Sequence, residues 1–158
     1  MNINVVNKSE NPLPKYARHG DAGMDICAAE DDFISAFNWK AISTGLFVEI
    51  PEGYEIQIRS RSGLAFKYGV SVLNSPGTID SGYRGEIKVI LKNSDHHRYD
   101  VKKGERIAQM VVAPVTTAIF TEVAELSDSE RGEGGLGSTG KWLIKINIML
   151  IMKHSLKK

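Results

Sequence analysis

Short apolar runs separated by turn residues extend through this chain and limit what it can fold into. Residues 54–59, YEIQIR, alternate apolar and polar side chains, which is the two-residue period of a half-buried strand. About ten such runs, turn signals roughly every ten residues and almost no helical pattern predict an all-β antiparallel sandwich or barrel. The acidic residues 30–38 and the polar residues 93–100 are expected to be connections. The clearest strand-like runs are residues 3–6, 41–50, 54–59, 86–92, 106–115 and 119–123.

The composition fits one globular domain with no strong overall charge. The chain has 158 residues, 42% hydrophobic and 25% charged, and one domain of this size buries about two-thirds of its unfolded surface. A formal net charge of +1, without a stripe of basic and aromatic residues, argues against a nucleic-acid partner. The longest apolar run, residues 142–152, contains Lys145 and Asn147 and is far shorter than the ~20 residues that span a bilayer, so no membrane segment is expected.

The N-terminus and the cysteine content indicate the compartment and the metal chemistry. The first residues lack a basic region followed by an apolar one, so we expect no signal peptide. Cys27 is the only cysteine, which excludes an intrachain disulfide and a thiolate zinc cluster and favours a reducing, cytoplasmic location. Because neighbouring strand residues point to opposite faces, His96 and His97 are not expected to bind a metal as a pair.

Residues 75–85 combine one acid and one aromatic residue with a series of turn residues. Pro76 fixes φ and the three glycines of this segment permit tight reversals, so the apolar runs on either side can pair as the arms of a hairpin. Asp80 would then lie on a rigid, concave arm. The alternative is that Asp80 only caps its own backbone in an Asx turn.

Two further segments carry polar groups that could belong to a site. Asp25 lies on a strand-like run after a glycine, although a solvent-facing strand acid would give the same pattern. Residues 64–68 can form a short helix with Ser60 or Ser62 near its N-cap and Gly69 as its C-terminal stop. Hydroxyls, Arg61 and free amides at a helix start suit an anion. An ordinary capped helix with a surface arginine is the alternative.

Residues 131–141 form a glycine-rich arm. The arm matches the first part of a phosphate-binding loop, G-x-x-x-x-G-K, but Trp142 stands where Ser or Thr should bind magnesium, so the match is false. Backbone amides and hydroxyls in such a segment can still form an anion nest, to which Arg131 adds a charge. A flexible linker is the alternative.

Five segments together resemble the five motifs of the homotrimeric dUTP diphosphatases (dUTPases), in the same order and at similar spacing. The resemblance covers the chain from about residue 15 to residue 141. The tail, residues 142–158, has no counterpart in it and its role is unknown. The segments are AGMDI at 22–26, RSGLA at 61–65, GTIDSGYRG at 77–85, GERIAQM at 104–110 and RGEGGLGSTG at 131–140.

The resemblance implies a jelly-roll β-barrel over residues 1–130, with one short helix after Ser62 and an active-site arm at residues 131–141 that is exchanged between the subunits of a homotrimer. It also implies the reaction, in which dUTP and water give dUMP and pyrophosphate. Magnesium is the implied cofactor. We expect the substrate phosphates to hold it mainly, because the sequence offers no dense carboxylate cage.

The resemblance assigns roles by motif. It implies that Asp80 activates the water that attacks the α-phosphorus, that Tyr83 packs under the deoxyribose and that Asn74 helps to read uracil. It implies that Asp25 holds magnesium through water. Leu136 stands where the family usually carries an aromatic residue over the base. The other implied substrate-binding residues are Arg61, Ser62, Gly63, Thr78, Ile79, Lys88, Gln109, Arg131, Gly137, Ser138 and Thr139.

Two other functions were compared with this one. A related class of enzymes with the same fold deaminates dCTP, but Tyr83 and the complete glycine arm favour the diphosphatase. A non-catalytic β-barrel that binds a partner is the second alternative, and the intact Asp80 argues against it.

Overall fold

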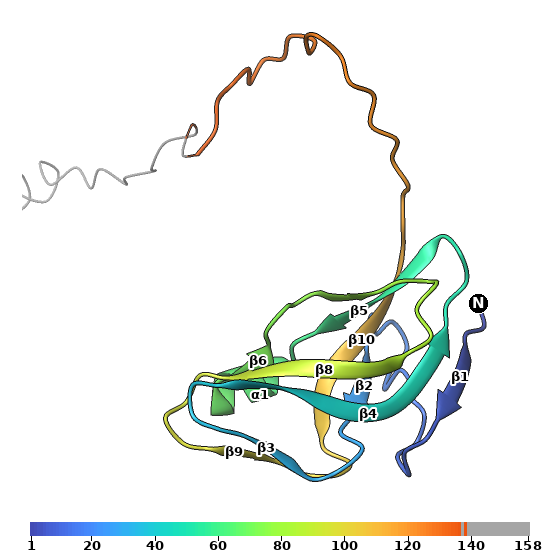
Figure 1. The fold of residues 1–158 in the computed structure, drawn as a ribbon, viewed down its shortest axis with the longest axis vertical. Coiled ribbons are helices and arrows are strands. Elements are labelled where there is room, and N and C mark those ends of the chain that lie inside the picture. The colour runs from blue at the N-terminus through green and yellow to red at the C-terminus, as the bar shows by residue number, and fades with distance from the viewer. Residues whose placement is uncertain (137, 139–158) are drawn as a thin grey trace, which may run out of the picture. The chain divides into compact units, whose positions relative to one another are not determined.

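The computed structural model describes residues 1–136 and 138, and this part of the chain forms ten strands and one helix (Figure 1). The prediction of a mainly β-structured chain with one short helix is confirmed. No described helix has the length and apolarity that crossing a membrane requires. The elements are β1 (Asn4–Asn7), β2 (Met24–Cys27), β3 (Asp32–Ile34), β4 (Trp39–Glu49), β5 (Tyr54–Arg59), α1 (Ser62–Tyr68), β6 (Val70–Val72), β7 (Gly77–Ile79), β8 (Glu86–Asn93), β9 (Tyr99–Val101) and β10 (Arg106–Pro114).

Two four-stranded sheets build the jelly-roll barrel. One sheet has the order β1-β4-β8-β6, the other has the order β2-β10-β5-β7, and β3 and β9 form a separate ribbon. Buried side chains of both sheets belong to one core, which includes Ile42 and Ile87 on one side and Ile26 and Ile58 on the other. Burying each such isoleucine contributes about 1.5–3 kcal/mol. The core therefore holds the two sheets together.

The segment between β6 and β8 forms the predicted hairpin. The apolar runs on its two sides pair antiparallel, with Val72 opposite Leu91. Between them, β7 leaves this sheet and pairs with β5 of the other sheet, where Thr78 lies opposite Gln57. The hairpin therefore connects the two sheets, and residues 80–85 lie in the connection.

A bulge in β4 supports the base of this hairpin. The register between β4 and β8 shifts between Ser43 and Phe47, and Gly45 in the bulge has φ +67°. A Cβ atom at Gly45 would lie 2.8 Å from the backbone nitrogen of Ser9. Both the positive φ and the close approach require glycine at this position.

Helix α1 begins where predicted but is capped differently. Its N-cap residue is Arg61 and forms no side-chain cap. The Ser60 hydroxyl instead accepts a hydrogen bond from the Val72 amide at 2.9 Å, so it serves β6 rather than the helix. Gly69 at the C-cap has φ +63°, which confirms the predicted stop.

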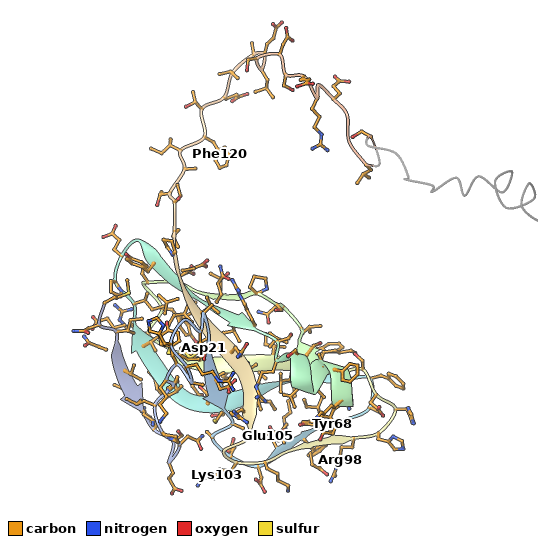
Figure 2. The ribbon with its side chains drawn as sticks, turned by 180° about the vertical axis from the view of Figure 1, so that it is seen from behind. Asp21, Tyr68, Arg98, Lys103, Glu105 and Phe120 are labelled. Atoms are coloured by element: carbon orange, nitrogen blue, oxygen red, sulfur yellow. The ribbon has the colours of Figure 1, made fainter. Side chains whose placement is uncertain are left out.

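Two predictions of local structure are wrong. Residues 30–38 were expected to be only a loop, but they contain β3, which pairs with β9 from the polar connection. Residues 119–123 were expected to form a strand and do not. Met1–Ala118 form one compact unit and Ile119 begins a second. Ile119 is 92% exposed and Phe120, labelled in Figure 2, is 96% exposed, so this apolar pattern has no partner strand in the part of the chain described.

Candidate active site

Five of the predicted site residues line one hollow of about 630 Å³ between β4, β7 and β8. We call Thr78, Ile79, Asp80, Tyr83 and Lys88 the hairpin set. The remaining walls of the hollow come from Ala41, Phe47, Glu86 and Ile90.

The carboxylate of Asp80 is exposed and available. The Tyr83 amide donates a hydrogen bond to the main-chain carbonyl of Asp80 at 3.1 Å. Within residues 1–136 and 138, no donor pairs with the Asp80 carboxylate, so the Asx turn considered as the alternative is not formed. An acid without a partner, at the edge of a polar and apolar hollow, can accept a proton from a bound water.

The ring of Tyr83 is held against the backbone. Its hydroxyl donates a hydrogen bond to the Glu86 carbonyl at 2.9 Å. The ring lies over Gly85, where an added Cβ would be 2.4 Å from the Tyr83 hydroxyl and 2.6 Å from the carbon that carries it. A side chain at position 85 would displace the Tyr83 ring, so Gly85 helps to fix where Tyr83 meets the hollow.

Arg84 and Glu86, the residues on either side of Gly85, hold the turn in place through hydrogen bonds. The Arg84 guanidinium donates to the carbonyls of Ser81 and Tyr83 at 2.6 and 2.9 Å. The Glu86 carboxylate accepts hydrogen bonds from the Ser43 hydroxyl and, at 2.9 Å, from the Gly45 amide of the β4 bulge. Partial burial acts to raise the pKa of Glu86, but these hydrogen bonds outweigh it and hold the pKa below its ordinary value. Neither Arg84 nor Glu86 was assigned this role from the sequence.

Asn74 lies at the entry to β7. Its side-chain nitrogen would be 3.1 Å from a Cβ placed on Gly77, so the absence of a side chain at Gly77 leaves room for it. Asn74 is exposed, and its amide can present a donor and an acceptor to a ligand beside β7.

A second polar cluster lies where β2, β10 and the start of α1 meet. We call Asp25, Arg61, Arg106 and Gln109 the Asp25 set. Arg61 Nε and Arg106 Nη1 lie 3.0 and 3.1 Å from the two carboxylate oxygens of Asp25, and Gln109 Nε2 lies 3.5 Å from one of them. Arg61 also donates to the Arg106 carbonyl at 2.9 Å. Two arginines share one acid, so the cluster keeps one positive charge for an anion.

A hollow of about 310 Å³ opens next to this cluster and is lined by Asp25, Gln109 and Asp21, among others. Asp21, labelled in Figure 2, accepts a hydrogen bond from the Arg18 amide at 2.8 Å. Ser62 and Gly63 are exposed at the adjoining end of α1, and a Cβ on Gly63 would meet nothing within 4 Å. A ligand can therefore approach these amides.

Arg106 was not assigned a role from the sequence, and the backbone explains why. In a regular strand, residues three apart point to opposite faces, so Arg106 and Gln109 would be separated. The register between β2 and β10 shifts between Arg106 and Ala108. This irregularity turns both side chains toward Asp25.

Cys27, next to this cluster, is not activated as a thiolate. Burial raises the pKa of its thiol, and the charge of Asp25 raises it further, against smaller opposing effects of Arg106 and Arg61. The group therefore stays a thiol near neutral pH.

The hairpin set and the Asp25 set are each formed within the chain, but they lie apart from each other as separate clusters. In the chain as described, no hydrogen bond or ion pair links the hairpin set to the Asp25 set. The described residues of the glycine-rich arm belong to neither set. Arg131, Leu136 and Ser138 are exposed, and Arg131 Nε donates to the Gly134 carbonyl at 2.8 Å. The predictions for Gly137, Thr139 and residues 142–158 lie outside the described residues.

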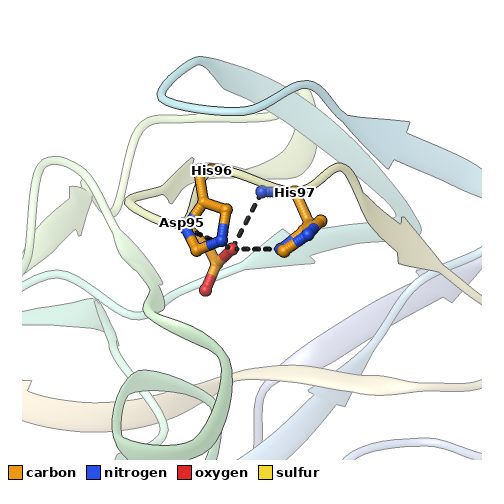
Figure 3. A group of neighbouring side chains, drawn as sticks. All are labelled: Asp95, His96 and His97. Carbon is orange, nitrogen blue, oxygen red and sulfur yellow. Dashed lines mark hydrogen bonds and ion pairs between the residues drawn. The ribbon is translucent and has the colours of Figure 1, made fainter.

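The structure overturns the reason given for excluding His96 and His97 as a metal pair. They lie in a bend between β8 and β9 and not on a strand, so their rings lie beside each other, with centroids 4.1 Å apart and planes tilted by 47° (Figure 3). Asp95 completes a group whose potential ligand atoms lie within 4.8 Å of one another. None of the three belongs to the hairpin set or the Asp25 set.

Comparison with known proteins gives consistent matches along most of the chain. The dUTPase family model matches residues 9–140. A deoxyuridine 5'-triphosphate nucleotidohydrolase of Nautilia profundicola is 58% identical over 129 residues, which cover 82% of this chain and 91% of that protein. The protein of the same description from Zymomonas mobilis is 51% identical over 129 residues, covering 82% of this chain and 88% of the relative.

Solved structures match as well. The dUTPase of Staphylococcus bacteriophage 80alpha with dUpNHpp has a TM-score of 0.81 and 32% identity, and the match covers 89% of this chain and 99% of the phage protein. A dUTPase mutant from phage phi11 of S. aureus, whose description mentions a structural Mg(II) ion, has a TM-score of 0.74 and 26% identity, covering 81% and 100%.

Proposed function

The chain belongs to the dUTPase family and is therefore a dUTP diphosphatase, and we propose that the hairpin set and the Asp25 set carry out its reaction together. The observation that supports this most directly is the hollow in which Asp80, Tyr83 and Lys88 lie together. The lone Cys27 supports a reducing, cytoplasmic location as part of the same proposal.

Asp80 is the general base of the proposed mechanism. Its unpaired carboxylate accepts a proton from water as the water oxygen bonds to the α-phosphorus and the bond to the bridging oxygen of pyrophosphate breaks. Tyr83, fixed by Gly85 and the Glu86 carbonyl, packs under the deoxyribose where a 2'-hydroxyl would clash. Thr78, Ile79, Lys88 and Asn74 complete the nucleoside side of the site in this proposal.

The Asp25 set serves the triphosphate. Arg61, Gln109 and the groups of Ser62 and Gly63 bind phosphate oxygens, and Asp25 orients Arg61 through the 3.0 Å ion pair. Arg106 shares the carboxylate of Asp25, so we add it to the residues that position Arg61. Fixed cations and amides of this kind stabilise the charge that develops during phosphoryl transfer.

Magnesium fits this site only in an indirect way. Both oxygens of Asp25 already pair with arginines, so a direct bond to a cation would displace a guanidinium, whereas contact through water leaves the pairs intact. When bound to the triphosphate, Mg²⁺ neutralises charge on the phosphate oxygens. Dependence on Mg²⁺ is part of the proposal.

The two sets are brought together in a homotrimer, with a hairpin set from one subunit facing an Asp25 set from another. The absence of contacts between the sets in residues 1–136 and 138 supports this arrangement, since the chemistry needs both. The exposed Ile119, Phe120 and Leu126 supply apolar area that a neighbouring subunit can cover. The arm then closes over a neighbour's site, where Arg131, Gly137, Ser138 and Thr139 clamp the γ-phosphate side and Leu136 covers the base.

The test is pyrophosphate release from dUTP, dCTP, dTTP, dATP, dGTP and UTP by the full-length protein, with ammonia measured in the dCTP reaction. We expect release from dUTP alone, and none without Mg²⁺. Ammonia from dCTP would instead support the deaminase alternative. Light scattering should give the mass of three chains, and an active monomer would contradict the shared site.

A further inference from the structure

The connection between β8 and β9 carries a compact group of metal-ligand side chains that the proposed mechanism does not use. Asp95, His96 and His97 follow directly after β8 (Figure 3). Glu86 and Lys88, which line the substrate hollow, are at the other end of this strand. The hollow extends along β8 as far as Ile90, about 10 Å from the last strand residue, Asn93, and none of the three residues of the group lines it.

The distances within the group suit a single small cation. Asp95 Oδ1 lies 3.1 Å from Nδ1 of His97 and 3.5 Å from Nδ1 of His96. With bonds of about 2.1 Å to zinc, two ligand atoms on one tetrahedral ion lie about 3.4 Å apart. A cation between these atoms can therefore be bound with small changes of side-chain torsion.

A buried asparagine holds the turn in this shape. Asn93 is 0% exposed. Its side-chain oxygen accepts a hydrogen bond from the Asp95 amide at 2.9 Å, and its side-chain nitrogen donates to the His97 carbonyl at 2.8 Å. The His97 amide also donates to Asp95 Oδ1 at 2.8 Å. The backbone that carries all three ligands is thus fixed before a metal arrives, which lowers the ordering cost of binding.

Asp95 is the one carboxylate of the group, and Lys67 and Arg98 line the hollow beside it. The nearest arginine in sequence, Arg98, pairs with Asp100 at 2.7 Å and lies over the ring of Phe33. The charge of Arg98 is therefore already paired with that of Asp100.

We propose that Asp95, His96 and His97 bind a divalent transition-metal ion of the Zn²⁺ class through one carboxylate and two imidazole groups. Two nitrogen ligands and one oxygen ligand suit Zn²⁺, Ni²⁺ and Cu²⁺, whereas Mg²⁺ prefers oxygen ligands only. Because both histidines are exposed, water can fill the remaining coordination positions and the ion can exchange. The site is distinct from the proposed magnesium dependence of dUTP hydrolysis.

Calorimetric titration of the chelator-treated, full-length protein with ZnCl₂, in excess MgCl₂ and without nucleotide, tests this site. The reference protein carries His19→Gln and His154→Gln, which remove the other two histidines of the chain. We expect one Zn²⁺ per chain in the reference. Adding His96→Gln and His97→Gln should weaken binding at least about tenfold, as should Asp95→Asn, which keeps an oxygen to accept the His97 amide.

Unchanged Zn²⁺ affinity in these variants, or no Zn²⁺ binding by the reference, would refute the site. Hydrolysis of dUTP with Mg²⁺ should stay within about twofold of the reference in all of them, because the group is remote from the substrate hollow. A large loss of hydrolysis by folded variants would contradict that separation. This control keeps the outcome for the metal site independent of the outcome for the proposed function.

Discussion

Gly85→Ala should damage the active site by displacing the ring of Tyr83. The added Cβ would be 2.4 Å from the Tyr83 hydroxyl, and ordinary contact begins at 3.4 Å, so the ring must move by about 1 Å. Tyr83 is 43% exposed and can swing toward solvent. We therefore expect the free energy of unfolding to fall by only about 1 kcal/mol, the low end for overpacking.

The catalytic effect should be larger than the effect on stability. Moving the ring breaks its 2.9 Å hydrogen bond to the Glu86 carbonyl and takes it from its proposed place beneath the sugar. A misplacement of about 1 Å can cost on the order of 10²-fold in rate, so we expect kcat/KM for dUTP to fall about 10- to 100-fold. Discrimination against UTP should fall with it, because the proposed role of Tyr83 is to exclude the 2'-hydroxyl.

The assay is steady-state pyrophosphate release with dUTP and UTP, beside a thermal unfolding curve. Gly82→Ala is the matched control, because a Cβ at Gly82 would meet nothing within 4 Å. In a Tyr83→Ala background, Gly85→Ala should change kcat/KM by less than about twofold, since the group that it displaces is gone. A folded Gly85→Ala enzyme with normal kcat/KM, or an equal loss in both backgrounds, would refute the reasoning.

Four other changes test the remaining assignments. Asp80→Asn should keep dUTP binding but lower kcat about 10²- to 10⁴-fold, the range for loss of a general base, and near-normal turnover would remove Asp80 from that role. Asp25→Asn should raise KM for dUTP more than it lowers kcat, because Arg61 loses its 3.0 Å partner, and an effect on kcat alone would contradict this. Leu136→Phe should raise kcat/KM about 2- to 10-fold by stacking on uracil, and a slower enzyme would show that Leu136 fits a lid of another shape. Truncation after Lys141 should leave turnover unchanged, and its loss would give the tail a catalytic role.

Local pattern determined much of the architecture and indicated the family. Period-two alternation located the main strands, and Gly69 located the end of α1, because side-chain direction and allowed φ angles are properties of a few neighbouring residues. Five motifs in order indicated the family. The roles of Asp25, Asp80 and the arm residues stay predictions, although the structure does place the hairpin set around one hollow.

Strand pairing and irregular backbone decided the rest. Residues 119–123 have strand-like alternation but no strand to pair with in the described chain, whereas β3, in a segment read as a loop, is paired by β9. Pairing needs a distant partner, which a local pattern does not contain.

The same physical reason applies to the side chains that only the structure brought together. The register shift in β10 turns Arg106 toward Asp25, the β4 bulge at Gly45 holds Glu86, and the bend fixed by Asn93 places His96 beside His97. By itself the sequence determined the main strands, the short helix and the family motifs of this protein. The tertiary structure decided where the regular period breaks, because bulges and bends form only where distant backbone and buried side chains compensate for the lost regular pairing.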